Sequence, residues 1–125
     1  MLAIFALLWL AACTSTASDP AGAPKVVEQY LQARVKADVN QMISLACADW
    51  ESQARVEAST FQSLQGEIEG MTCSVSGTDG GTAFVACQGK IKTSYQGETR
   101  ERDLAQQQFK LVQAGGDWRV CGYRP

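Results

Sequence analysis

Five cysteines carry the most recognisable chemistry in the sequence, because a thiol can form a disulfide, bind a metal ion or accept a lipid. They are Cys13, Cys47, Cys73, Cys87 and Cys121. No two of them have the Cys-x-x-Cys spacing of a zinc knuckle or a redox dithiol, and the chain has no histidine. Disulfides therefore explain the cysteines better than redox chemistry or a metal site, and no metal ion or other cofactor is expected.

Cys13 differs from the other cysteines because it follows a short apolar run. Residues 4–10 are continuously hydrophobic, and two alanines precede the cysteine. Residues 1–12 are too few to cross a bilayer, which takes about 20 apolar residues, but they suit a signal peptide. The tetrad Leu-Ala-Ala-Cys at 10–13 resembles the bacterial lipobox, which implies cleavage before Cys13 and lipidation of its thiol. The sequence departs from that pattern in having no Lys or Arg before the apolar run.

The expected anchor places the protein in the cell envelope, because more than one acyl chain holds a protein firmly on a membrane. Thr14 follows the cysteine, which by resemblance to lipoproteins of two-membrane bacteria favours the outer membrane. The small, polar residues that follow cannot build a core, so residues 13–23 are predicted to be the lipidated cysteine and a flexible tether. The folded domain is then expected over residues 24–125.

Four cysteines remain for the folded domain. In an oxidising compartment they imply two disulfides, with three connectivities open. Cys73 and Cys87 share the inner face of adjacent predicted strands, on either side of one turn. This placement predicts a Cys73–Cys87 disulfide and, by exclusion, a Cys47–Cys121 disulfide. The second closes a long loop, which the chain-entropy model values at about 4–5 kcal/mol.

The first part of the domain has helical periodicity. Apolar residues in 24–37 recur at spacings of three and four, which predicts an amphipathic helix with Arg34 on its apolar stripe. Asp38 or Asn40 can cap a second helix. A third helix is expected over about 48–59.

After Gly66 the period changes to two, which is typical of strands. The predicted strands cover 71–76, 82–95, 100–113 and 118–123. Turns rich in Gly, Asp and Gln separate them. The alternation slips between Leu104 and Phe109, which predicts a bulge within the third strand.

These elements predict an α+β fold in which N-terminal helices pack on a curved four-stranded antiparallel meander sheet. Helices followed by a long meander that ends in Asp-Trp-Arg-Val at 117–120 resemble the nuclear transport factor 2-like superfamily, which has a cystatin-like α+β fold. The stretches at 47–51 and 118–123 also resemble a set of bacterial lipoproteins of that type. The resemblance covers roughly residues 24–124. It implies a fold but no single function, because that superfamily includes enzymes, binders and scaffolds.

The resemblance also implies a conical cavity between the helices and the concave sheet. The side chains that could line it are Tyr30, Arg34, Trp50 and Tyr95. Arg34 is expected to pair with an acidic group under the sheet or to extend to its edge. Asp49 and Glu51 are two residues apart and diverge on a helix, so they do not form a catalytic carboxylate pair.

The sequence favours a non-enzymatic envelope module that binds a small apolar ligand or a partner protein. Its net charge of −2, from 11 basic and 13 acidic residues mixed along the chain, argues against nucleic-acid binding. Assembly through the polar face of the sheet is a weaker alternative, because that face offers little hydrophobic area.

A ketosteroid isomerase-like enzyme is the other alternative. It would need a buried carboxylate of raised pKa beside a tyrosine hydroxyl. The tyrosines that could donate are Tyr30, Tyr95 and Tyr123. The carboxylates whose orientation the sequence leaves open are Glu67, Glu69 and Asp103.

Overall fold

The computed structural model describes residues 19–124, so the predicted signal peptide, Cys13 and the first part of the tether lie outside the described residues. The described chain has three α-helices followed by a five-stranded antiparallel sheet. The helices are α1 (Ala23–Val35), α2 (Val39–Leu45) and α3 (Glu51–Thr60). The strands are β1 (Gln65–Asp79), β2 (Thr82–Tyr95), β3 (Glu98–Asp103), β4 (Gln108–Ala114) and β5 (Asp117–Arg124). Short 3-10 turns cover η1 (Pro20–Gly22), η2 (Ala48–Trp50) and η3 (Leu104–Gln106).

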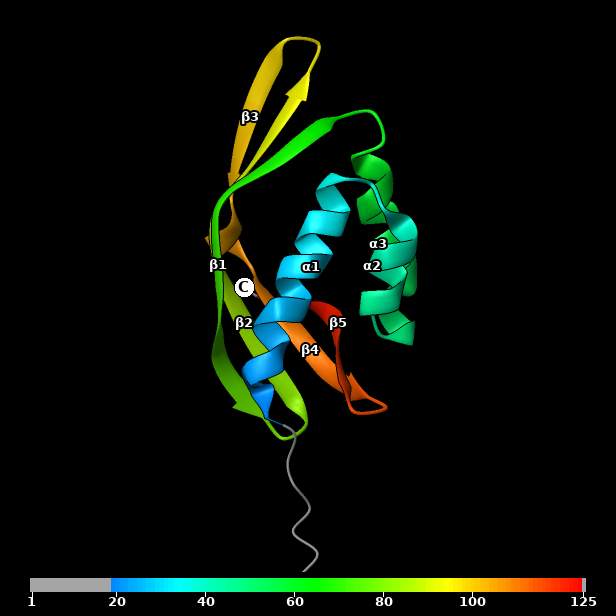
Figure 1. Ribbon diagram of the computed structural model, residues 1–125, viewed down its shortest axis with the longest axis vertical. Coiled ribbons are helices and arrows are strands. Elements are labelled where there is room, and N and C mark those ends of the chain that lie inside the picture. Colours follow the sequence, from blue (N-terminus) through cyan, green and yellow to red (C-terminus); the bar gives the residue numbers. More distant parts are fainter. Residues whose placement is uncertain (1–18, 125) are drawn as a thin grey trace, which may run out of the picture.

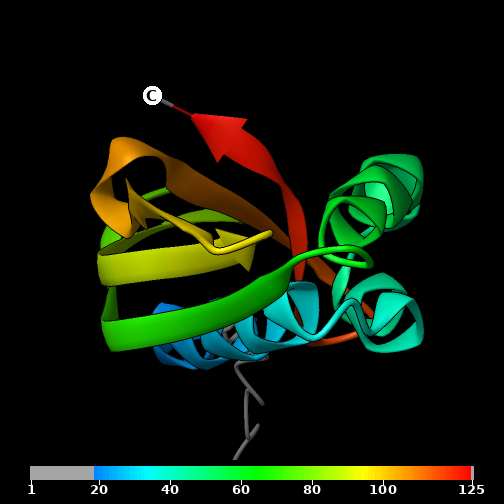
Figure 2. The same cartoon turned by 90° about the horizontal axis from the view of Figure 1, so that it is seen from above.

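Helix α1 lies against the concave face of the sheet, as two perpendicular views show (Figures 1 and 2). Pro24 is in its first turn, where the missing N–H leaves no helical hydrogen bond unmade. Val27, Tyr30 and Leu31 are buried on the predicted apolar stripe. The helix ends before the predicted residue 37, because Ala37 has a φ of 53° and turns the chain into α2.

Helices α2 and α3 form a second layer beside one end of the sheet (Figure 2). Asp38, one of the two predicted caps, accepts a hydrogen bond from the Gln41 amide at 3.2 Å and so starts α2. The predicted third helix over 48–59 is divided: its first turn is the 3-10 turn η2, and α3 follows from Glu51. No helix within residues 19–124 is both long enough and apolar enough to span a membrane.

The sheet has five strands, which corrects the prediction of four. Strand β2 has the predicted bounds 82–95 and is central: β1 pairs along one edge, while β4 and β3 divide the other. Strand β5 pairs with β4. The predicted strand over 100–113 breaks in two because Leu104 turns into the core. Asp103 caps the resulting 3-10 turn by accepting the Ala105 amide at 2.8 Å.

Strand β1 begins at Gln65, six residues before the predicted start at Met71. Its first part contains glycines and glutamates, which rarely favour strands, so pairing with β2 determines its conformation. The pairing shifts between Glu69 and Thr72, opposite Gly89. Gly89 has a φ of +116°, and a Cβ there would lie 2.7 Å from the Glu69 carbonyl oxygen. This irregularity lies where the sheet bends around α1 (Figure 1).

Two disulfides join the elements, in the pairs that the sequence predicts. Cys73–Cys87 links register partners on β1 and β2. Cys47–Cys121 links the segment after α2 to β5, where the Cys47 amide also donates to the Val120 carbonyl at 2.9 Å. This second link holds the helix pair at the end of the sheet and brings α3 next to β5.

Candidate functional site

The interior between α1, α3 and β5 contains a buried carboxylate. Glu57 of α3 is only 5% exposed and is the one buried charged residue within 19–124. The sequence reasoning missed it, although a signal existed. In the helix expected over about 48–59, Ala54 and Ala58 are four residues apart and share one side, and Glu57 lies between them on that side.

Four side chains from three other elements surround this carboxylate. The Tyr30 hydroxyl donates to Glu57 Oε1 at 2.9 Å, and the Tyr123 hydroxyl donates to Glu57 Oε2. Arg34 Nη1 lies 3.1 Å from Glu57 Oε2. Trp50 Nε1 in turn donates to the Tyr30 hydroxyl at 3.1 Å. Both carboxylate oxygens therefore have partners, as a charge removed from water requires.

The two tyrosines act here as hydrogen-bond donors. Burial, followed by the negative charge of Glu57, raises the pKa of the Tyr30 hydroxyl far above its ordinary value. The same two causes, in the same order, raise the pKa of Tyr123. Both hydroxyls therefore keep their protons at neutral pH and stabilise the carboxylate between them.

Aromatic rings fill most of the space beside the carboxylate. The Phe109 ring makes edge contacts with Tyr30 and Tyr123, with centroid separations of 6.3 and 4.9 Å. Trp50 meets Tyr123 in the same way at 5.3 Å. A cavity of about 20 Å³ remains near Arg34 and Tyr123, which is room for about one water molecule.

Three of the four predicted pocket residues, Tyr30, Arg34 and Trp50, meet in this cluster. Tyr95 does not: its side chain is 52% exposed near the tip of the β2–β3 hairpin, because β2 extends beyond the helices (Figure 1). Arg34 pairs with an acidic group under the sheet, which is one of the two roles expected for it.

The carboxylates that the sequence left open are exposed. Glu67 and Glu69 belong to β1, and Glu69 pairs with Lys92 at 3.0 Å. Asp103 caps η3. The buried carboxylate beside the tyrosines is therefore none of the three candidates. Within the described residues no cluster of His, Cys, Asp or Glu could hold a metal ion.

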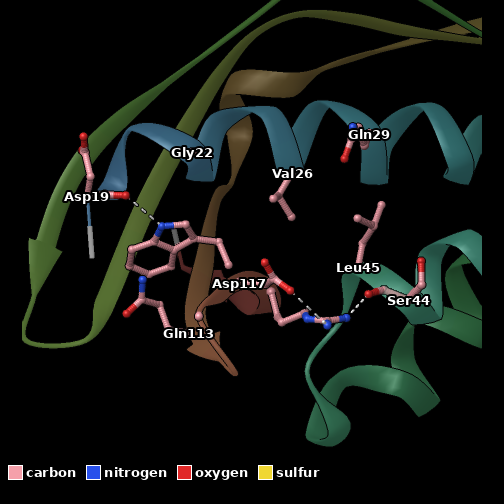
Figure 3. A pocket seen from close by; sticks show the side chains of 11 residues that line it. Asp19, Gly22, Val26, Gln29, Ser44, Leu45, Gln113 and Asp117 are labelled. Carbon is pink, nitrogen blue, oxygen red and sulfur yellow. Dashed lines mark hydrogen bonds and ion pairs between the residues drawn. The ribbon is translucent and has the colours of Figure 1, made fainter. Parts of the chain in front are cut away.

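An open groove of about 560 Å³ lies at the other end of the domain, between the first half of α1, the end of α2 and the β4–β5 turn. Val26 and Leu45 face it from the two helices (Figure 3). Trp118 lines one side, and its indole N–H donates to the Asp19 carbonyl at 3.1 Å. Arg119 lines the floor and donates to the Ser44 carbonyl. The groove is thus lined by both apolar and polar side chains.

Comparison with known proteins identifies the fold. No protein-family model matches the chain, and no curated protein matches it in sequence. A ketosteroid isomerase-like protein from Erwinia carotovora atroseptica is similar in structure, with a TM-score of 0.56, 20% identity and coverage of 79% of this chain and 88% of that one.

Two further solved structures are similar to this domain in fold. A candidate dehydratase of the nuclear transport factor 2-like family from Streptomyces avermitilis has a TM-score of 0.56 and 14% identity, over 82% of this chain and 90% of that one. A protein of that kind with a cystatin-like fold, from Novosphingobium aromaticivorans, has a TM-score of 0.52 and 10% identity, over 79% and 75%. The domain therefore has the cystatin-like fold of nuclear transport factor 2-like proteins. At these identities the likeness extends to the fold alone.

Proposed function

We propose that this protein is an exported, lipid-anchored envelope lipoprotein whose domain is a non-enzymatic binding module. The observation that carries the proposal is the filled interior. The cavity between α1 and the sheet, which Arg34, Phe109 and Tyr123 line, has only about 20 Å³, whereas a pocket that encloses a small organic ligand has about 300–1,000 Å³. A ligand is therefore bound on the outside of the domain.

The chemistry of the cluster supports a structural role for Glu57. A general base must reach the proton that it removes, within hydrogen-bond distance or through one water. Both oxygens of Glu57 instead accept hydrogen bonds from Tyr30 and Tyr123, and Arg34 balances the charge. Such a closed network holds three elements together.

The groove beside Trp118 is the best site for a small apolar ligand. It offers about 560 Å³, and Val26, Leu45 and Trp118 supply apolar surface. The described chain begins at Asp19, on the rim of this groove. An anchor at Cys13 would therefore hold the groove close to the membrane, where apolar molecules are concentrated.

The ligand is tested by native mass spectrometry of the full chain, exported through an oxidising compartment and purified in mild detergent. We expect an additional mass that leaves on activation. Val26→Lys places a charge in the groove and should remove that mass. Val56→Lys is the matched control, because Val56 is 58% exposed on α3 and does not line the groove. Retention of the mass in Val26→Lys would argue against this site.

The anchor is tested separately by labelling cells with a radioactive fatty acid. The protein should incorporate the label and remain in the membrane fraction, whereas Cys13→Ser should do neither. Label in the Cys13→Ser variant, or a wild-type protein without label, would contradict the lipid anchor.

One observation favours the second candidate, a ketosteroid isomerase-like small-molecule enzyme. Glu57 is a buried carboxylate beside two tyrosine hydroxyls, which is the placement of groups that such an enzyme would need. The test is isomerase turnover of a small unsaturated ketone by wild type and by Glu57→Gln. Turnover that disappears in Glu57→Gln while the variant stays folded would replace the binding proposal with the enzymatic one.

A further inference from the structure

Strand β3 is an unusually accessible sheet edge. It pairs with β2 on one side, and the sheet order gives it no partner on the other. All six of its residues are exposed. The hairpin of β2 and β3 projects beyond the ends of α1 and α3, at the opposite end of the domain from the start of α1 (Figure 1). Its backbone donors and acceptors are therefore available to another strand.

The charges of this hairpin are sorted between its two faces. On the outer face Glu101 is opposite Lys92, and the pair is joined by Lys90 and Glu69 in ion pairs of 3.0–3.6 Å. On the inner face Arg102 is opposite the buried Ile91. Glu67 is also opposite Lys92 and Asp103 is opposite Lys90, so the outer face is acidic overall.

The inner face keeps two arginines that form no ion pair within residues 19–124. Arg100 is opposite Thr93 and lines a depression of about 280 Å³ together with Leu64 and Tyr95. Arg102 lies at the mouth of the interior cavity, where Arg34 is already engaged with Glu57. Glu98, at the tip, is the one acidic residue that lines this depression.

We propose that the free edge of β3 binds an extended acidic segment of a partner protein as an additional strand. Side chains on one face of a strand alternate with a period of two. Carboxylates at every second position of the segment would therefore meet Arg100 and Arg102, while backbone hydrogen bonds extend the sheet. The exposed Tyr95 ring adds an amphipathic contact of the kind enriched at interfaces. This inference names a partner class and a surface for the proposed binding function and rests on it.

The charges of β3 disfavour pairing with a second copy of the same strand in the registers centred on Glu101 or Arg102. Either register sets the central residue against its own copy and forms no opposite-charge pair within β3. Like charges directly opposite one another destabilise a strand pair. An acidic segment with neutral residues between its carboxylates can place two carboxylates opposite Arg100 and Arg102.

The test uses a fluorescent peptide in which threonine and glutamate alternate over seven residues, and the full chain in detergent. Binding is measured by fluorescence anisotropy at low and high salt. We expect saturable binding that weakens with salt, and no binding of the same peptide with lysine in place of glutamate. The double variant Arg100→Glu/Arg102→Glu should weaken binding by roughly tenfold or more. The matched control Arg55→Glu/Lys110→Glu changes the net charge by the same amount, at exposed residues outside the hairpin. It should bind the peptide as the wild type does.

Strand addition is tested separately by methylating alternate backbone nitrogens of the peptide, in two versions that block opposite edges. One version should lose binding, because only one edge of the peptide faces β3. Equal binding of both methylated versions, or of the charge-reversed double variant, would overturn the proposal. The Val26→Lys variant should bind the peptide normally, so failure at this edge is distinguishable from failure of the groove.

Discussion

The Glu57 cluster and the β2–β3 hairpin both contain acidic and basic side chains, but burial gives them different roles. In the cluster one carboxylate has three direct partners from two other elements and is only 5% exposed. On the hairpin, Lys92 and its acidic partners remain partly or largely exposed to solvent. Buried charges hold secondary-structure elements together, because separating them would leave a charge unpaired in the interior at a large cost in free energy. Exposed charges contribute little to folding stability and chiefly determine which partners the surface attracts or repels.

The largest expected effect comes from removing the buried carboxylate. Glu57→Ala should lower the free energy of unfolding by about 3–5 kcal/mol, because it leaves the partly buried Arg34 without its counter-charge and two hydroxyls without an acceptor. Urea unfolding followed by circular dichroism measures the change. If Glu57→Ala unfolds at nearly the wild-type urea concentration, the cluster is not what holds α1, α3 and β5 together.

Removing either disulfide should give the next largest loss of stability, and the two losses should differ. Alanine at both Cys47 and Cys121, which are 74 residues apart, should cost about 4 kcal/mol in the chain-entropy model. The same change at Cys73 and Cys87, 14 residues apart, should cost about 3 kcal/mol.

Denaturant midpoints of the two double variants check this order. A larger loss from the Cys73–Cys87 pair would mean that the β1–β2 ribbon depends more on its disulfide than the helix attachment does.

Alkaline pH should loosen the cluster through its tyrosines. The folded pKa of Tyr30 and of Tyr123 is raised above the ordinary value of 10.0, because burial and then Glu57 disfavour the phenolate. Their contribution to stability is therefore complete below about pH 10 and falls as pH rises above it, by up to about 1.4 kcal/mol per pH unit for each tyrosine.

Urea unfolding between pH 8 and 11 measures this slope. The double variant Tyr30→Phe/Tyr123→Phe should be less stable at pH 8 but should lose less stability between pH 10 and 11. An unchanged slope in the double variant would show that other groups cause the alkaline loss.

The smallest effect is expected on the hairpin. Lys92→Ala removes ion pairs to Glu69 and Glu101 at 3.0 and 3.6 Å, but these side chains are solvated. The unfolding midpoint should not change measurably. A clear loss of stability would mean that the ion pairs across β1, β2 and β3 act as a network that stabilises the projecting hairpin.

Local pattern predicted much of this fold. The bounds of β2 follow from the period of two that is clearest over residues 87–92, and α1 follows from its apolar stripe. The cysteine pairs could be predicted because Cys73 and Cys87 flank one turn. The break at Leu104 was less visible, because a slipped alternation has the same appearance whether the strand bulges or leaves the sheet.

The sequence by itself determined α1, the bounds of β2 and the Cys73–Cys87 pair, because these depend on patterns along a short stretch of chain. Only the tertiary structure decided that Glu57 is buried and Tyr95 is exposed. A glutamate on a short helix is normally solvated, and Glu57 is buried here because Tyr30 and Arg34 of α1 and Tyr123 of β5 converge on it. Tyr95 is exposed because the helices end before β2 does, and no local pattern records where a neighbouring element ends.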